Sequence, residues 1–421
     1  DMYVNTGAGE PAPVATVTAK VPSTLREGAE IPAYITTPKG YKADGSFPFV
    51  VMIHGHGGNH NESDGFDKIS NGLAEQGFVV ATLDLPGCGK SKESFQLNTM
   101  TNMKADVLDV IDYVCKNYAV DKTRIGAFGY SMGGRITLEL LAEGKYSFST
   151  IELVAPAEDL TDLKNLFGGA ENWDTMKAEA NEKGYVEFTT KYGQHQQLSK
   201  EWFADLEKYS DGLVEKAAEN YTGDSLVIWA TNDEAVSPSV SSAVATTLGS
   251  ATLNTYADGH SYSFYGTTEY TISTVNNGSV NYFVNELKTN ETRIHGYVQS
   301  IAKYGNLELT IPGSELDKAG FEYGDLLKIT VDGKEFTVPY GTNYSDVDQG
   351  STILRNSDGH LTLAINMGDF AGKNGIATKK TNEDKTYEWY YAAETNIPAV
   401  VTIEMGEKGG YYDEWLIHQL K

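Results

Sequence analysis

The chain has 421 residues, of which 40% are hydrophobic, so it is long enough for two or three domains with sizeable cores. Its formal net charge of −25 comes from 33 basic and 58 acidic residues, and such a charge repels nucleic acids and anionic membranes. We therefore expect no nucleic-acid partner. Because no apolar stretch approaches the roughly 20 residues that cross a bilayer, we also expect no membrane insertion.

The start of the chain bears on its location. It begins at Asp1 with no charged-then-apolar signal segment, and the polar residues 5–13 are of the kind often found after a removed export signal. A trimmed chain explains the same start, so we expect a secreted or cell-surface protein, with a cytoplasmic location as the alternative. Cys88 and Cys115 form neither a disulfide framework nor a metal-ligand cluster, and we interpret both as structural.

The first 290 residues alternate between strand-like and helix-like segments. Residues 14–21 and 31–37 predict two strands joined by a polar turn. The unbroken apolar run at 49–53 is typical of a strand buried on both faces, as in a parallel sheet. Further strands are predicted at 78–83, 124–128, 150–154, 225–230 and 251–256, and helices at 66–76, 100–117, 136–141 and in a segment that ends near Leu287. Repeated units of this kind predict an α/β fold with a doubly wound, mostly parallel sheet.

Residues 155–222 interrupt the alternation with polar, helix-prone sequence that is rich in aromatic residues. An insertion at this point overhangs the carboxyl ends of the strands, where open α/β sheets bind ligands. We interpret it as a lid. Most of its aromatic side chains are expected to pack the lid onto the sheet, and two or three to face the substrate. The aromatic residues are Phe167, Trp173, Tyr185, Phe188, Tyr192, Trp202, Phe203, Tyr209 and Tyr221.

The composition changes near residues 289–293. The remainder of the chain is β-rich, contains no long amphipathic pattern, and has turn signals at Asp332-Gly333, Asp358-Gly359 and Gly409-Gly410. We therefore expect a first domain over 1–290 and a smaller all-β domain over 293–421.

The run Gly129-Tyr130-Ser131-Met132-Gly133 has the glycine-x-serine-x-glycine form of a nucleophile elbow. It lies between an apolar, strand-like segment and a helix-like one, as that motif requires. The elbow is a tight turn that pushes the serine hydroxyl out of the sheet, and its glycines avoid clashes in so sharp a bend. Ser131 is therefore the candidate nucleophile.

A serine nucleophile needs a histidine base and an acid that orients the base, and on an α/β sheet these follow the serine in the order acid, histidine. His54, His56 and His60 precede Ser131. The other histidines that come after it lie in the lid, at His195, or in or beside the second domain, at His295, His360 and His418. His260, directly after a predicted strand, is the expected base.

Asp233 is the expected acid because it lies in the loop after the strand at 225–230. Glu234 and Asp258 are rivals. Glu234 is one residue further along the loop, and Asp258 is so close to His260 in sequence that its reach is awkward.

The glycine-rich loop at 54–59 comes after the strand at 49–53 and lets the main chain approach a carbonyl closely. The backbone N–H groups of His56 and Met132 are the expected oxyanion hole. A metal site at His54, His56 and His60 is the alternative, although the loop already explains the histidine-glycine pattern. No metal and no cofactor are expected.

With these residues in place, the first domain resembles the α/β-hydrolase superfamily and, within it, the cinnamoyl and feruloyl esterases of gut bacteria. The likeness covers about residues 14–287 and includes the loops at 54–59 and 84–91, the elbow, and the loops of Asp233 and His260. It implies a serine esterase. The resemblance departs at His56, where that family usually has an apolar or aromatic residue, and the lid cannot be matched to the family residue by residue.

The second domain resembles the C-terminal β-barrel of the S-adenosylmethionine hydroxide adenosyltransferase family, in the stretches 304–311, 344–350 and 356–366. That family's active site also needs an N-terminal domain that has no counterpart here, so the likeness implies a fold and not adenosyl chemistry. We interpret this domain as a structural or assembly module. Binding of a polymer or surface through its aromatic residues is the alternative.

Together these features predict a serine carboxylesterase for small acyl or aryl esters, including hydroxycinnamoyl esters linked to polysaccharide fragments. Two other functions stay open. One is a serine peptidase of the prolyl-oligopeptidase type, which shares the order of the triad but usually carries an N-terminal propeller. The other is a binding or assembly protein that acts through the β-domain.

Overall fold

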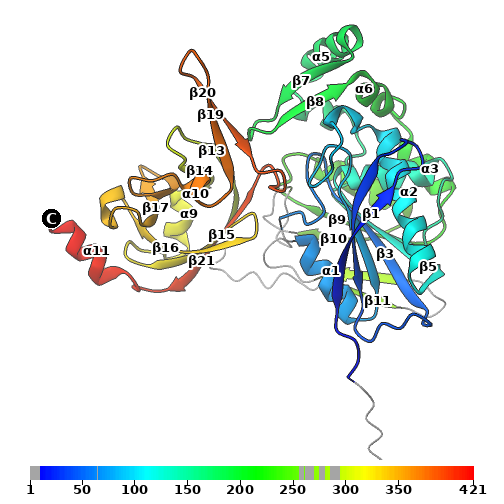
Figure 1. The fold of residues 1–421 in the computed structure, drawn as a ribbon, viewed down its shortest axis with the longest axis horizontal. Helices are drawn as coiled ribbons and strands as arrows, with labels where there is room; N and C mark the ends of the chain where they lie inside the picture. The colour runs from blue at the N-terminus through cyan, green and yellow to red at the C-terminus, as the bar shows by residue number, and fades with distance from the viewer. Residues whose placement is uncertain (1–9, 64, 256–259, 261–269, 275–279, 285–293) are drawn as a thin grey trace, which may run out of the picture.

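The computed structural model describes residues 10–63, 65–255, 260, 270–274, 280–284 and 294–421. An α/β part and a β-rich part lie side by side (Figure 1). The predicted domain boundary near 290–293 and the rival acid Asp258 lie outside the described residues.

The α/β part is built on one eight-stranded sheet with the order β1-β2-β4-β3-β5-β6-β9-β10. The pairs β1-β2 and β2-β4 are antiparallel, and all later pairs are parallel. The central strand β3 is buried along most of its length, as its unbroken apolar sequence predicts. The bounds of the strands are β1 Ala15–Pro22, β2 Glu30–Thr37, β3 Phe47–Ile53, β4 Val79–Leu83, β5 Val120–Tyr130, β6 Thr150–Val154, β9 Asp224–Ala230 and β10 Ala251–Thr255.

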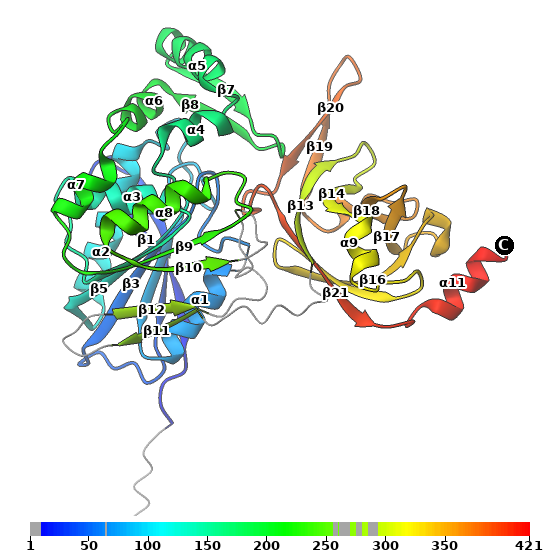
Figure 2. The ribbon, with the colours of Figure 1, turned by 180° about the vertical axis from the view of Figure 1, so that it is seen from behind.

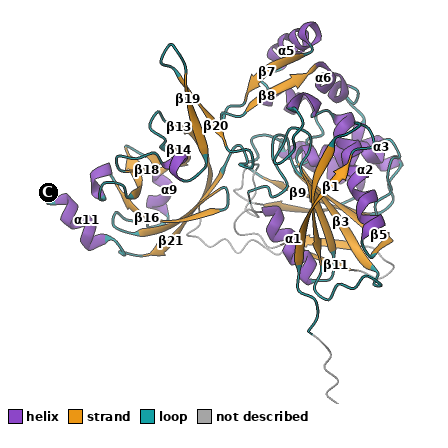
Figure 3. Ribbon diagram, in the orientation of Figure 1, coloured by secondary structure: helices purple, strands orange, loops and turns teal. Residues whose placement is uncertain are grey.

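Helices connect and cover these strands (Figures 2 and 3). The helix α2 packs along β1 to β5, α1 lies against β4, and α8 lies against β9. Their bounds are α1 Gly65–Glu75, α2 Met100–Asn117, α3 Met132–Ala142 and α8 Pro238–Leu248. The sheet and its crossover helices confirm the expected α/β-hydrolase architecture.

Two local features differ from the sequence-based expectation. The helix α8 was not predicted, although Pro238 at its first turn is a recognised helix-start signal. The prediction of a helix that ends near Leu287 is wrong. The described residues of this region form the antiparallel strands β11 Tyr270–Thr274 and β12 Val280–Val284. These two strand segments are rich in β-branched and aromatic residues, which favour strands over helices.

The lid, residues 155–222, contains four helices and one hairpin. Its aromatic side chains include Trp173, Trp202 and Phe203, which are fully or almost fully buried. The antiparallel hairpin β7-β8 was not predicted. The bounds are α4 Leu160–Leu166, α5 Ala170–Lys183, β7 Tyr185–Thr189, β8 His195–Ser199, α6 Lys200–Glu207 and α7 Leu213–Glu219.

One fully buried cation holds the lid to the elbow helix. Arg135 in α3 bonds Glu139 in its own helix and donates to the carbonyl oxygens of Ala157, Glu158, Leu206 and Tyr209 at 2.7 to 3.3 Å. These carbonyls belong to the start of the lid and to α6 and the turn that follows it. The lid is therefore anchored on the helix that begins directly after Ser131.

The β-rich part is a closed seven-stranded barrel with the order β13-β14-β18-β17-β16-β15-β21, which confirms the all-β expectation. It has a hydrophobic core separate from that of the α/β part. The hairpin β19-β20 projects from it (Figure 1), and Tyr390 of β20 stacks on His195 of the lid strand β8. The bounds are β13 Ile294–Ile301, β14 Leu307–Pro312, β15 Leu326–Val331, β16 Lys334–Gly341, β17 Thr352–Ser357, β18 His360–Ile365, β19 Ala377–Thr381, β20 Tyr387–Tyr391 and β21 Val400–Glu407.

The part of the chain that the structure describes contains no helix long and apolar enough to span a bilayer.

Candidate active site

Ser131 occupies a strained turn between β5 and α3. Its backbone has φ 53° and ψ −113°, a combination that non-glycine residues rarely adopt and that the nucleophile elbow imposes. The turn is fixed because Ser131 N–H donates to Val154 O and Ala157 N–H donates to Ser131 O. A side chain at Gly133 would come within 2.0 Å of Ile53 O, so the elbow needs glycine there.

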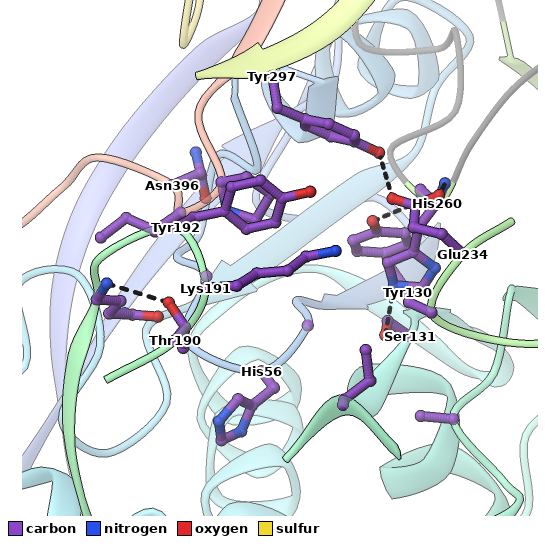
Figure 4. Close-up of a pocket in the computed structure, with 18 of the residues that line it drawn as sticks. His56, Tyr130, Ser131, Thr190, Lys191, Tyr192, Glu234, His260, Tyr297 and Asn396 are labelled. Carbon is purple, nitrogen blue, oxygen red and sulfur yellow. Dashed lines mark hydrogen bonds between the residues drawn. The ribbon is translucent and has the colours of Figure 1, made fainter. Parts of the chain in front are cut away.

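Ser131 bonds to His260, as Figure 4 shows, and His260 in turn bonds to Asp233. His260 Nε2 lies 2.9 Å from Ser131 Oγ, and His260 Nδ1 lies 3.1 Å from each carboxylate oxygen of Asp233. With the proton on Nδ1, the ring donates to Asp233 and accepts the serine hydroxyl proton on Nε2. The predicted nucleophile, base and acid thus have the geometry of an acyl-transfer triad.

The charged forms of His260 and Asp233 stabilise each other. Burial alone would raise the pKa of Asp233, but His260 and the N–H groups of Ala235 and Val236 outweigh burial and hold that pKa below its usual value. Burial alone would lower the pKa of His260, but the Asp233 carboxylate outweighs burial and raises it. The imidazolium that forms when His260 takes a proton is therefore stabilised.

Two residues outside the triad hold the histidine from other sides. Tyr130 donates its hydroxyl to His260 O at 2.7 Å, and the two rings stack with centroids 5.3 Å apart. Glu234, the rival acid, accepts the His260 backbone N–H at 3.0 Å. Asp233 is therefore the carboxylate on the ring nitrogen Nδ1, and Glu234 positions the main chain.

The expected oxyanion donors lie where the loop after β3 meets the start of α3. An added side chain at Gly55 would lie 3.3 Å from Ser131 Cβ, so this loop passes directly beside the nucleophile. Met132 begins α3, and first-turn N–H groups have no partner within a helix. Gly55 N–H is already bonded to Glu62 Oε1 at 2.8 Å, which leaves His56 N–H as the next donor along the loop.

The lid hairpin clamps this loop. Gln196 Oε1 accepts a bond from His56 Nε2 at 2.9 Å, and Gln194 Nε2 donates to Gly57 O at 2.9 Å. Burial lowers the pKa of His56 below its ordinary value, although the bond to Gln196 opposes this effect. The ring also contacts Phe167 edge-on, with centroids 5.4 Å apart. His56 therefore joins the loop at 54–59, called the oxyanion loop below, to the lid. Its bond to Gln196 connects residues 140 positions apart, and no local sequence motif reveals it.

The three early histidines do not converge on one point. His54 is fully buried, receives a bond from Leu85 N–H, and has a pKa that burial lowers to about 4. His60 bonds Asp84 through Nδ1 at 2.9 Å and stacks on Tyr34. Among the described residues, no group of histidine, cysteine, aspartate and glutamate could hold a metal ion. Each histidine has its own structural partner.

A cavity of about 460 Å³ opens over Ser131 and His260. The lid lines it with Leu163, Phe167 and Phe188 and with the hairpin turn at 190–194. Three of the predicted aromatic residues therefore face it: Phe167, Phe188 and Tyr192. Other lining residues come from the barrel: Tyr297, Asn396, Ile397, Pro398 and Val400. The arrangement is that of a serine hydrolase whose nucleophile lies in a cavity between the lid and the barrel.

Comparison with known proteins agrees with this class. The family described as "Serine aminopeptidase, S33" matches residues 47–260, half of the chain. The chain therefore belongs to this family of α/β hydrolases. The family described as "SAM hydroxide adenosyltransferase C-terminal domain" matches residues 296–383, in agreement with the resemblance seen in the second domain.

Curated relatives match a shorter stretch. Esterase FrsA of Shigella boydii serotype 18 is 29% identical over 128 residues, and esterase FrsA of Citrobacter koseri is 30% identical over 128 residues. Each match covers 29% of this chain and 29% of the relative. The chain thus aligns with less than a third of the length of these relatives.

Several solved structures are similar. Est1E from Butyrivibrio proteoclasticus has a TM-score of 0.46 and 19% identity, over 58% of this chain and 90% of its own. Est1E with bound ferulic acid has a TM-score of 0.47 and 22% identity, over 56% and 89%. The hypothetical protein PA2218 from Pseudomonas aeruginosa has a TM-score of 0.49 and 14% identity, over 60% and 89%.

Proposed function

We propose that the protein is a serine carboxylesterase that works through Ser131, His260 and Asp233. The observation that carries this proposal is the unbroken path from Ser131 Oγ through His260 to Asp233, with every separation at hydrogen-bond distance. Ser131, at one end of this path, lines a cavity that is large enough for a small ester.

The reaction follows from the positions of these atoms. Ser131 Oγ attacks the ester carbonyl carbon while His260 Nε2 takes the hydroxyl proton, and the His56 and Met132 N–H groups hold the oxyanion that forms. His260 then gives the proton to the alcohol oxygen, the carbon–oxygen bond breaks, and the acyl group stays on Ser131. Water, activated by His260, attacks the acyl carbon and releases the acid and the free serine.

The lining of the cavity favours small acyl or aryl esters. Leu163, Phe167 and Phe188 give the lid side of the cavity an apolar and aromatic wall, which suits a flat acyl group. Together with the resemblance in sequence to cinnamoyl and feruloyl esterases, this supports hydroxycinnamoyl esters, including those on polysaccharide fragments, as the substrates.

A peptidase is the second candidate, because the family description is that of an aminopeptidase. A carboxylate in the cavity with no other partner would favour binding of a peptide's amino terminus. Three acidic side chains line it, and each already accepts bonds from the protein: Glu62 from Gly55 N–H, Asp162 from Ser237, and Glu234 from His260 N–H. This engagement favours an ester over a peptide.

One comparison decides between the candidates. Methyl ferulate, a p-nitrophenyl ester and a dipeptide anilide are tested with the parent protein and with Ser131→Ala. An esterase hydrolyses both esters efficiently and the anilide poorly, and the variant loses this activity by more than about a thousandfold. Efficient cleavage of the anilide with no preference for esters supports the peptidase. Ester hydrolysis by Ser131→Ala within about tenfold of the parent contradicts both.

A further inference from the structure

The C-terminal barrel forms part of the wall of the cavity that holds Ser131. Tyr297 on β13 and the segment 396–398, just before β21, line the same cavity as the triad. Val400 at the start of β21 is buried in the hydrophobic cluster of the α/β part, and Tyr297 packs against that cluster. The cavity is therefore bounded by residues from both parts of the chain.

Buried polar bonds fix this wall in place. Asn396, of which only 4% is exposed, donates through Nδ2 to Asp332 Oδ1 at 2.9 Å and to Asn61 Oδ1 at 3.2 Å. Ser63 Oγ donates to the same Asp332 oxygen at 2.6 Å. Asn61 and Ser63 flank Glu62, whose carboxylate accepts the N–H of the loop glycine beside the nucleophile. The barrel is thus bonded to the segment that supports the oxyanion loop.

A second set of bonds links the barrel to the histidine. Tyr297 donates its hydroxyl to Glu234 Oε1 at 2.9 Å, and His260 N–H donates to Oε2 of the same carboxylate at 3.0 Å. Figure 4 shows Tyr297 beside Glu234 and His260, and His56 on the opposite side of the cavity. The barrel therefore approaches the reaction centre from the side of the histidine.

This side of the cavity has a defined chemical role. In acyl transfer, the histidine gives its proton to the oxygen of the departing alcohol, so the alcohol part of the ester must lie toward Nε2. The acyl part lies on the other side, toward the oxyanion donors and the aromatic wall of the lid. Tyr297, which shares the Glu234 carboxylate with His260, brings the barrel wall beside the alcohol part, and Ile397 belongs to the same wall.

We propose that the barrel forms the leaving-group subsite of the enzyme, with Ile397 and Tyr297 as specificity-determining residues for the alcohol. This inference rests on the proposed esterase function. The ligand it assigns to the barrel is an ester alcohol large enough to extend beyond His260. The barrel is then a part of the substrate site in addition to any structural role.

The experiment uses the full chain and two series of esters. In one series the acyl group is constant and the alcohol grows from methanol to a bulky aryl or cyclic alcohol. In the other the alcohol is methanol and the acyl group grows. The variants are Ile397→Ala and Ile397→Trp, with Tyr297→Leu as a second change in the same wall. The matched control is Ile417→Ala, an exposed position on the helix α11, Tyr412–Gln419.

The subsite predicts a selective effect. The ratio of kcat/KM between the bulky and the methyl alcohol changes by about tenfold or more in the wall variants, which is the size expected for altered packing in a pocket. The ratio between large and small acyl groups stays within about twofold of the parent, and Ile417→Ala changes neither ratio. Active-site titration corrects every rate for the amount of folded enzyme.

The outcomes separate the two proposals. If the parent hydrolyses the esters but the wall variants change both ratios equally, or change only the acyl ratio, or change neither, the leaving-group subsite is wrong and the esterase proposal stands. If the parent hydrolyses no ester, the esterase proposal fails and the subsite fails with it.

Discussion

The hydroxyl of Tyr297 donates to Glu234 at 2.9 Å, although the two residues lie 63 positions apart in different parts of the fold. The other oxygen of the same carboxylate accepts the backbone N–H of His260. One carboxylate therefore connects a barrel tyrosine to the main chain of the proposed catalytic base. A substitution at Tyr297 should therefore alter the position of His260.

Replacing Tyr297 by phenylalanine removes the bond to Glu234 and keeps the ring. We expect kcat for a methyl ester to fall several-fold with little change in KM, because the ring still lines the cavity while the histidine is held less firmly. A hydrogen bond to a charged group contributes about 1.5–3 kcal/mol. Because Glu234 also holds the backbone of His260, losing this bond should weaken the positioning of His260. The control is Tyr304→Phe at an exposed barrel position. An equal kcat in parent and variant would show that the bond has no part in positioning.

The pH profile depends on the charge of Glu234. The Asp233 and Glu234 carboxylates raise the pKa of His260 above 6.5 against the effect of burial. Since His260 must be neutral to accept a proton, kcat/KM falls as the pH drops through that pKa. Glu234→Gln removes one negative charge and destabilises the imidazolium, so the acidic limb of the profile moves to lower pH.

The control for this profile is Glu182→Gln, an exposed position on the lid helix α5. It should leave the acidic limb where the parent has it. A limb that stays in place, or moves to higher pH, in Glu234→Gln would contradict the assigned electrostatics.

Arg135 should be essential for stability. It is fully buried, and its replacement by methionine leaves the Glu139 carboxylate and four carbonyl oxygens without this donor. Removal of one partner from a buried ion pair destabilises a protein by about 3–5 kcal/mol. Denaturant unfolding should show a loss of this size, whereas Lys183→Met, which breaks an exposed pair with Glu179, should leave the free energy of unfolding nearly unchanged. Similar midpoints for both variants would contradict this role.

Asp332 makes the contact between the barrel and the α/β part sensitive to pH. Burial raises its pKa, and the bonds from Ser63 and Asn396 only partly oppose that effect. A raised pKa means that the folded state binds the proton more tightly than the unfolded state does. The contribution of Asp332 to the free energy of unfolding therefore decreases as the pH rises above the pKa that Asp332 has in the unfolded chain. We expect Asp332→Asn to gain in Tm relative to the parent as the pH rises from about 5 to about 8. Asp358→Asn, at an exposed turn, should show no such trend; a gain for Asp332→Asn that shrinks as the pH rises would contradict the argument.

The sequence predicts the residues whose signals are local. Ser131 lies in a motif, and Asp233 and His260 each come after a strand at the carboxyl edge of the sheet, where the topology brings them together. Glu234 is a rival acid in the sequence because adjacent carboxylates look alike there, and only the fold shows that one of its oxygens meets a backbone N–H.

Other features depend on packing between distant segments. The contact of Tyr297 with Glu234, and of Asn396 with Asn61, joins positions that share no motif, so no pattern in the sequence indicates them. The alternation of strands and helices suggests a helix that ends near Leu287, while the β-branched composition of this region favours the strands that form. The lid hairpin has little strand signal because it contains polar residues such as Gln196, which bonds to the oxyanion loop instead.

The most direct test of the central claim is to trap the acyl-enzyme. The parent protein is treated with a fluorophosphonate or a slowly deacylating aryl ester, and the modified peptide is identified by mass spectrometry, with Ser131→Ala and His260→Ala treated in parallel. We expect one adduct per chain, on Ser131, in the parent, none in Ser131→Ala and greatly slowed formation in His260→Ala. Ester hydrolysis that proceeds with no adduct on Ser131, or with the adduct on another residue, would contradict the proposed mechanism.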